Sequence, residues 1–362
     1  MHRISTFPLR GISSSLLLLQ ARLNPTIKAA TLQIPSHFRH FTSYSPDTTS
    51  TPFYPSNRLK GRTCMITGGS SGIGLSIAER FLNEEVGRII LVGRSLERLV
   101  RAAKQLDRTV AGAAGARSAE TDQEHDSSVA TRMPEEDQAL DRDKISPGTL
   151  IESSDRIGLL VGDISEASSW ARELENAMQP IDILINAAGI STSSVLPRTD
   201  PADISRVLRT NLEGALLTSR ALFRASIRNR MKSRTADLQD GLPIPSKCII
   251  NISSLLALKG GTGAVPYAAS KAGVLGMTRS LTVEASKTLR NQAVRVNAIV
   301  PGYIETPMIA DFSQGENERL KAEIPLRRFG QPHEVADAAV FLAHNEYANN
   351  CVINLDGGLS AI

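Results

Sequence analysis

The sequence predicts one α/β domain with a doubly wound, mostly parallel sheet and helices on both faces. Two observations support this prediction. Short apolar runs alternate with helical patterns, and a run without polar alternation is typical of a strand buried on both faces. The first run leads through a glycine-rich turn into an amphipathic helix that ends near Phe81. We therefore expect seven strands, with ligand at their carboxyl ends, at 62–66, 88–92, 158–161, 181–185, 248–252, 294–299 and 352–355.

The turn after the first strand has the sequence Thr67-Gly68-Gly69-Ser70-Ser71-Gly72-Ile73-Gly74. A strand, a glycine turn and a helix in this order direct the backbone N–H groups of a helix N-terminus toward a pyrophosphate. The glycines are spaced G-x-x-x-G-x-G rather than G-x-G-x-x-G, so this turn alone is weak evidence for a dinucleotide site.

Tyr267 and Lys271 are four residues apart, and Ser254 precedes Tyr267 by thirteen residues. On a helix, residues four apart share one face, so the ammonium group can lie beside the phenol. An adjacent cation favours the phenolate and lowers a pKa that is ordinarily about 10. Ser254 can donate a hydrogen bond to the substrate oxygen atom that the phenol would also contact. A Tyr and a Lys at this spacing also occur on ordinary amphipathic helices, so the other motifs must decide between the two interpretations.

Together the motifs resemble those of the short-chain dehydrogenase/reductase family over residues 59–362. They are highly specific as an ordered set. The resemblance implies a single Rossmann-like domain. The matching residues, in chain order, are Gly68/Gly72/Gly74, Asn186-Ala187-Ala188-Gly189, Asn211, Ser254, Tyr267, Lys271, Pro301-Gly302 and Asp356-Gly357-Gly358.

The resemblance also implies catalytic roles. Tyr267 would be the general acid that protonates a carbonyl oxygen, while Lys271 would hold the nicotinamide ribose and lower the phenol pKa. Ser254 would orient the carbonyl group, and Asn211 would support a water molecule that resupplies protons. The spacing to Tyr267 favours Ser254 over its neighbour Ser253, which we interpret as a packing residue.

NADPH is the cofactor that the resemblance favours, with NADH as the alternative. Arg94 ends the second predicted strand, where an NAD enzyme would keep an acid, and it would contact a 2′-phosphate. Ser71 stands where many related NADP enzymes carry Arg. Asp163 would lie against the adenine, which is compatible with a helix N-cap. The cofactor-binding set is Gly68, Ser70, Ser71, Gly72, Ile73, Gly74, Arg94, Asp163, Asn186, Ala187, Gly189, Tyr267, Lys271, Pro301, Gly302, Ile304 and Thr306.

Three segments resemble 3-oxoacyl-[acyl-carrier-protein] reductases, namely 195–199, 255–260 and 324–330. This resemblance implies a carrier-linked substrate and a homotetramer. Combined with the predicted N-terminal transit peptide described below, it suggests mitochondrial fatty-acid synthesis. The alternatives are an NAD(P)-dependent dehydrogenase of a small alcohol, sugar or hydroxyacyl-CoA, and a noncatalytic dinucleotide-binding scaffold. Ala348-Asn349-Asn350 departs from the family pattern before the last strand. Asn tolerates a left-handed backbone, so we expect Asn350 to keep the turn.

Residues 1–41 are predicted to be a mitochondrial transit peptide, followed by a linker over 42–58. The segment is rich in Ser, Thr and Arg and lacks acids and a long apolar core. A disordered cytosolic tail is the alternative. Without the five cations of residues 1–46, the chain keeps 36 Lys and Arg against 37 acids. The body therefore gives no electrostatic argument for nucleic acid, and no stretch is long enough to span a membrane.

Two insertions interrupt the predicted domain, at about 109–156 and 229–246. The first lacks aromatic residues and has ten acids against four Lys and Arg over 109–154, so we expect a disordered surface segment. A basic cluster lies at the start of the second, and it suits either a helix C-terminus or an acidic carrier protein. Its members are Arg224, Arg228, Arg230, Lys232 and Arg234.

Cysteine and histidine usage predicts no metal site. Cys64, Cys248 and Cys351 each lie in an apolar run without a CxxC pair. Buried, inert thiols explain them better than a disulfide framework or a zinc site.

Overall fold

The computed structural model describes residues 57–118, 145–233, 246–289, 293–310 and 312–362. All of them belong to the compact unit Phe53–Ile362, whereas the other unit, Met1–Pro52, lies outside the described residues. The predicted transit peptide and nearly all of the predicted linker therefore fall outside them as well.

An eight-stranded sheet forms the centre of the domain, in the order β3-β4-β2-β1-β5-β6-β7-β8. Only β3 is antiparallel to its neighbour, and every other adjacent pair is parallel. The doubly wound α/β prediction is thus confirmed, with one strand more than predicted. The strands are β1 Thr63–Thr67, β2 Arg88–Gly93, β3 Thr149–Ser154, β4 Ile157–Val161, β5 Ile183–Asn186, β6 Lys247–Ile252, β7 Val294–Pro301 and β8 Val352–Leu355.

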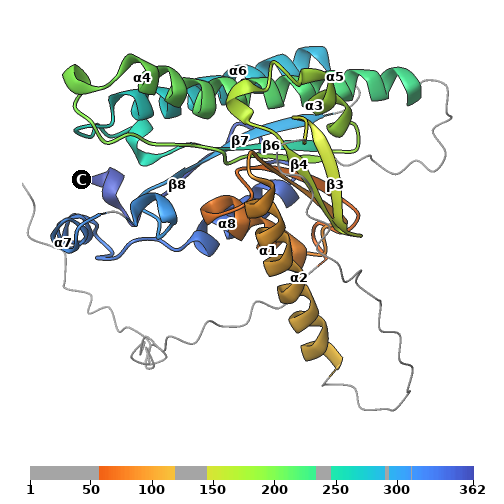
Figure 1. Cartoon of the computed structure of the whole chain (residues 1–362), viewed down its shortest axis with the longest axis horizontal. Coiled ribbons are helices and arrows are strands. Elements are labelled where there is room, and N and C mark those ends of the chain that lie inside the picture. Colours follow the sequence, from red (N-terminus) through yellow and green to blue (C-terminus); the bar gives the residue numbers. More distant parts are fainter. Residues whose placement is uncertain (1–56, 119–144, 234–245, 290–292, 311) are drawn as a thin grey trace, which may run out of the picture. The chain divides into compact units, whose positions relative to one another are not determined.

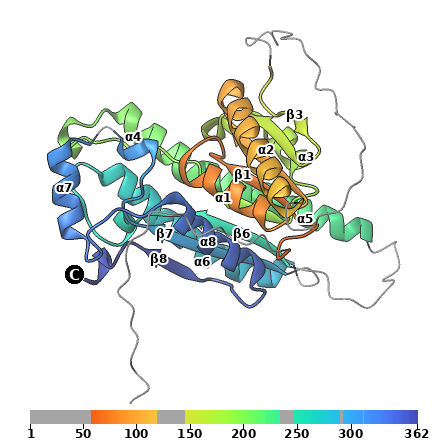
Figure 2. The same cartoon turned by 90° about the horizontal axis from the view of Figure 1, so that it is seen from below.

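Helices cover both faces of this sheet (Figures 1 and 2). One face carries α1 Gly72–Asn83, α2 Leu96–Ser118 and α8 Pro332–His344. The other carries α3 Ala171–Ala177, α4 Pro201–Leu208, α5 Gly214–Ser233 and α6 Val265–Thr288. Side chains of each strand alternate between the two cores, as in Cys64 and Ile66 on one side and Met65 on the other. Burial on both faces explains why the strands read as continuous apolar runs.

Strand β1 lies between β2 and β5, so the connections lead outward in both directions from this point. Ligands of open α/β sheets bind at such a switch point, beyond the carboxyl ends of the strands. The glycine turn after β1 and the Asn-Ala-Ala-Gly segment after β5 meet at this point.

The structure corrects the predicted insertion over 109–156 at both ends. Helix α2 continues to Ser118, and Thr149–Ser154 form the edge strand β3. The side chains of β3 are mostly exposed, so it needs few apolar residues, and its backbone is satisfied by pairing with β4. Residues 119–144 lie outside the described residues. At the second insertion α5 runs to Ser233, and 234–245 lie outside the described residues.

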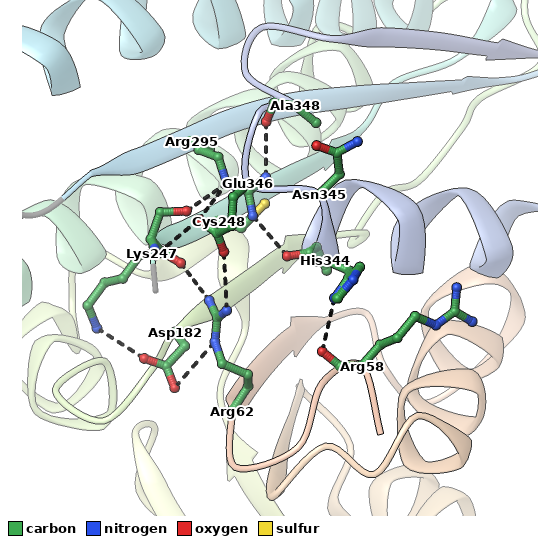
Figure 3. A network of polar contacts seen from close by, with 12 residues as sticks. Arg58, Arg62, Asp182, Lys247, Cys248, Arg295, His344, Asn345, Glu346 and Ala348 are labelled. Atoms are coloured by element: carbon green, nitrogen blue, oxygen red, sulfur yellow. Dashed lines mark hydrogen bonds and ion pairs between the residues drawn. The ribbon is translucent and has the colours of Figure 1, made fainter. Parts of the chain in front are cut away.

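The buried side chain of Arg295 in β7 forms hydrogen bonds with the segment that connects α8 to β8 (Figure 3). Its guanidinium group donates to the carbonyl oxygens of Leu342, Ala343 and Ala348 at 2.6, 2.8 and 3.0 Å. Helix C-termini leave such carbonyls without helical partners, and buried ones need a donor. Asn350 has φ 58°, which confirms the predicted left-handed turn.

Candidate active site

Tyr267 and Lys271 lie in the first two turns of α6. Ser254 is the second residue after β6 and the N-cap of a short 3-10 helix, Leu255–Ala257. Ser254 is 9% exposed and Lys271 is 4% exposed, while Tyr267 is half-buried. The Lys271 Nζ atom is 5.7 Å from the centroid of the Tyr267 ring. Ser253 points elsewhere, because its hydroxyl donates to the backbone carbonyl of Lys271 at 2.9 Å.

The pKa values at this site differ from the sequence expectation. Burial raises the pKa of the Tyr267 phenol, and a hydrogen bond with Ser254 offsets only part of this effect. Burial also lowers the pKa of Lys271 to about 8. The ammonium donates to the carbonyl oxygen of Ile252 at 2.9 Å and does not bond the phenol. The prediction that Lys271 lowers the phenol pKa is therefore wrong for the protein without cofactor.

Asn211 lies in a π-helical turn, Arg209–Glu213, between α4 and α5, and is 2% exposed. Its Oδ1 atom accepts from the amide of Ile190 at 2.8 Å, and its Nδ2 atom donates to the carbonyl of Ile190 at 2.9 Å. A Cβ atom on Gly189 would stand 3.3 Å from Lys271 Nζ and 3.5 Å from Asn211 Oδ1. The bare backbone of Gly189 therefore leaves room where Asn211 and Lys271 approach each other.

The glycine turn forms a close-packed cradle at the start of α1. Gly68 has φ +68°, and a Cβ atom there would lie 2.8 Å from the Cα atom of Ala188. A Cβ atom on Gly74 would collide with the carbonyl oxygen of Gly68. Ser71 is the N-cap of α1, and its side chain forms no capping hydrogen bond in the described structure. The first turn of α1 contains no acidic residue. The backbone N–H groups at the start of α1 can therefore donate hydrogen bonds to a phosphate oxygen.

Arg94 and Asp163 follow β2 and β4 and form an ion pair of 3.7 Å at the same edge of the sheet. Asp163 also caps the next 3-10 helix, because its carboxylate accepts from the amide of Ser165 at 2.9 Å. The predicted N-cap is confirmed. Arg94 is 70% exposed in its side chain, so it can turn toward a ligand.

Asn186 contributes its side chain to the interior of the fold. Its Nδ2 atom donates to Asn251 Oδ1 at 2.9 Å, and its Oδ1 atom accepts from Thr218 at 2.7 Å. This network ties β5 to β6 and α5, so only the backbone after Asn186 is left to face a cofactor. Ala187 and Ala188 both donate their amides to Thr67 Oγ1 at 3.2 Å. Sequence reasoning missed Thr67, whose one signal was its position between a buried strand and the glycine turn.

The segment after β7 meets the glycine turn through Thr306. A Cβ atom on Gly72 would lie 3.4 Å from the Thr306 methyl group. The Ile304 side chain packs into the core at 6% exposure, and its backbone forms a bridge with Gly330. Gly302 lies flush against Asp356, since a Cβ atom would be 2.8 Å from the Cα atom of that residue. Of the predicted residues here, Thr306 lies against the glycine turn, whereas the Ile304 side chain is buried in the core.

Within the described ranges no group of His, Cys, Asp and Glu could hold a metal ion. Burial raises the pKa of the Cys64 and Cys248 thiols, as expected of inert cysteines. No described helix is long and apolar enough to cross a bilayer.

The fold and the grouped Ser, Tyr and Lys define an oxidoreductase of the α/β class. Residues 112–360 match the family model described as enoyl-(acyl carrier protein) reductase, and 62–142 match the one described as short chain dehydrogenase. The chain belongs to the short-chain dehydrogenase/reductase family.

Several curated relatives are named as 3-oxoacyl-[acyl-carrier-protein] reductases. A 3-oxoacyl-[acyl-carrier-protein] reductase of Bos taurus is 32% identical over 298 residues, which are 82% of this chain and 98% of the relative. One of Thermotoga maritima is 32% identical over 308 residues, with 83% and 99% covered. A solved 3-oxoacyl-[acyl-carrier protein] reductase of Brucella melitensis matches with a TM-score of 0.64 at 23% identity, covering 86% of this chain and 97% of that one. At that identity the structure supports the fold alone.

Proposed function

We propose that this protein reduces a 3-oxoacyl thioester, carried by an acyl carrier protein, to the 3-hydroxyacyl form with NADPH. The observation that carries the proposal is the grouping of Ser254, Tyr267 and Lys271 at the carboxyl end of β6. The names of the relatives support the substrate class.

The chain's own groups suit a reduction at neutral pH. Bound NADPH would supply a hydride to the carbonyl carbon. Ser254 donates to the carbonyl oxygen, and Tyr267 gives that oxygen its proton. Because burial raises the phenol pKa, Tyr267 is protonated at neutral pH and can act as the acid. Lys271, with a pKa of about 8, mostly keeps its proton at pH 7 and provides a cation beside the site.

The cofactor suits the cradle that the chain builds. The N-terminus of α1 would hold the pyrophosphate, and Thr306 and Gly189 would border the nicotinamide side. Arg94 would bind the 2′-phosphate, because its present pair with Asp163 is exposed and such pairs contribute little. These features support NADPH over NADH.

Replacing Arg94 by Ala is expected to weaken NADPH binding about tenfold, since one charge-assisted hydrogen bond to a phosphate is lost. NADH binding should change little, because NADH lacks the 2′-phosphate. Fluorescence titration of each cofactor measures both constants. Arg98→Ala is the matched control, because Arg98 is also exposed and lies nearby, in the first turn of α2. Equal loss for both cofactors, or a wild-type protein that prefers NADH, would contradict the assignment.

The basic cluster of α5 is partly engaged within the fold. Arg224 and Arg228, together with Arg220, surround the single carboxylate of Glu175 at 3.1, 2.8 and 3.5 Å. Three guanidinium groups around one carboxylate leave an excess of positive charge on this surface. The side chains of Arg230, Lys232 and Arg234 lie outside the described residues, so a carrier-docking role of the cluster rests on Arg220, Arg224 and Arg228.

One substrate panel tests the proposed function. Acetoacetyl carrier protein and acetoacetyl-CoA are tested with NADPH and with NADH, and 3-hydroxyacyl-CoA and polyols with NADP+ and with NAD+, by following absorbance of the reduced cofactor. The proposal requires the highest kcat/KM for the carrier-linked thioester with NADPH. Preferential oxidation of a polyol or of 3-hydroxyacyl-CoA would replace it with the dehydrogenase alternative. Absence of turnover with every substrate would favour a scaffold.

We further propose that residues 1–41 direct the protein to the mitochondrial matrix, on the basis of their Arg-rich and acid-free composition. The mature protein is expected to begin near Thr42. N-terminal sequencing of the protein isolated from mitochondria gives the result, and an intact Met1 together with cytoplasmic recovery would exclude the proposal.

A further inference from the structure

Ser270 lies between two residues of the proposed catalytic site. Its hydroxyl donates to the carbonyl oxygen of Tyr267 at 2.7 Å and accepts from Asn211 Nδ2 at 3.0 Å. The residue is completely buried. It therefore joins the first turn of α6, which carries Tyr267, to the π-helical turn that carries Asn211.

The hydrogen-bond polarity at Ser270 and at the Ile190 backbone together select one orientation of the Asn211 amide. A Ser hydroxyl has one proton, and that proton goes to the Tyr267 carbonyl, so Ser270 can only accept from Asn211. The two N–H groups of Asn211 then serve Ser270 and the carbonyl of Ile190. Its Oδ1 atom faces the Ile190 amide. A flipped amide would set Nδ2 against the Ile190 N–H and Oδ1 against the Ile190 carbonyl. Ser270 could then bond Oδ1 only by giving up its hydrogen bond to the Tyr267 carbonyl.

This orientation matters because of where Oδ1 points. Oδ1 and Lys271 Nζ both border the space above Gly189, at 3.5 and 3.3 Å from the position of a Cβ atom there. Since Oδ1 accepts one hydrogen bond from Ile190, it has capacity to accept another. The amide thus presents an acceptor, not a donor, toward the ammonium group.

We propose that Ser270 is a positioning residue that, together with the Ile190 backbone, fixes the orientation of the Asn211 amide and holds Asn211 in register with Tyr267. Its effect on turnover rests on the proposed function, whereas its effect on the Asn211 contacts does not. Ser286 of the same helix gives the comparison. Its hydroxyl also donates to the carbonyl three residues earlier, Val283, at 2.7 Å, but it is exposed. The helical back-bond alone is therefore not specific to Ser270.

Hydrogen exchange of the protein without added ligand tests the contact directly. Ser270→Ala should speed exchange of the Ile190 amide, which donates to Asn211 Oδ1, about fivefold, as expected for one weakened hydrogen bond. Ser286→Ala should leave it unchanged. If Ser270→Ala does not fold, Ser270→Cys keeps a side chain of similar shape with a weaker donor and should give a smaller change in the same direction. Unchanged Ile190 exchange in a folded variant would overturn the proposal.

A double-mutant cycle then separates positioning from general packing. In the wild-type background Ser270→Ala should lower kcat for the 3-oxoacyl thioester about tenfold, with KM within about twofold. In the Asn211→Ala background the same change should have almost no effect on kcat, because its target is gone. Equal effects in both backgrounds would overturn the proposal. If the wild-type protein reduces no 3-oxoacyl thioester, the proposed function fails, and the exchange result still decides the role of Ser270.

Discussion

Replacing Tyr267 by Phe is expected to lower kcat for the carbonyl substrate by at least about 100-fold, the low end for loss of acid-base catalysis. The change removes the proton donor and leaves the ring, which lies 5.7 Å from Lys271 Nζ. NADPH affinity should stay within about twofold, because the glycine turn and Arg94 are untouched. Steady-state turnover and a separate cofactor titration give the two quantities.

Tyr303→Phe is the matched control for this variant. Tyr303 is also a partly buried phenol whose pKa is raised by burial, but its ring packs against Phe312 and Phe329. Loss of the Tyr303 hydroxyl should leave kcat within about threefold of the wild-type value, since this hydroxyl is not part of the group formed by Ser254, Tyr267 and Lys271. Full activity in Tyr267→Phe would remove the catalytic assignment, and parallel losses in both variants would show a general effect on packing.

The parts of the fold that the sequence predicted are those whose burial shows in local pattern. Strands such as β1 and β6 are buried on both faces, so they contain runs of consecutive apolar residues, Cys64–Ile66 and Cys248–Ile250. Strand β3 has mostly exposed side chains and is stabilised by backbone hydrogen bonds to β4. Backbone hydrogen bonds do not require particular side chains, so the amino-acid composition of β3 does not reveal them. A polar segment of this kind resembles a disordered one until its partner strand is placed. The same reason explains the wrong strand count.

Site residues could be predicted from the sequence where spacing along one element decides position. Ser254, Tyr267 and Lys271 follow from a strand end and one helix face. Thr67 and Ser270 were missed because their partners are distant in the sequence, at Ala187 and Asn211. The raised pKa of the Tyr267 phenol could not be predicted either, because it depends on burial by the assembled fold.

Replacing Arg295 by Met is expected to lower the free energy of unfolding by about 3 to 5 kcal/mol, because several buried acceptors lose their donor at once. Arg295 is 3% exposed and serves the carbonyls at the end of α8 as well as the Ser246 hydroxyl at 2.6 Å (Figure 3). Its carboxylate neighbour Glu346, at 3.7 Å, is 52% exposed and can be solvated after the change. The cost therefore comes from stranded carbonyls rather than from a stranded charge.

Urea denaturation measures this loss, and Arg319→Met supplies the control. Arg319 forms exposed pairs with Glu316 and Glu323 on α7, Gln314–Glu323, so its replacement should cost less than about 1 kcal/mol. Arg295→Lys tests geometry against charge, since an ammonium cannot reach acceptors on several sides at once and should recover less than half of the loss. Arg295 pairs in register with Cys248 at the amino end of β6, away from Ser254. NADPH affinity of the folded variant should therefore stay at the wild-type value. A loss below about 1 kcal/mol in Arg295→Met would show that water replaces the guanidinium group at these carbonyls.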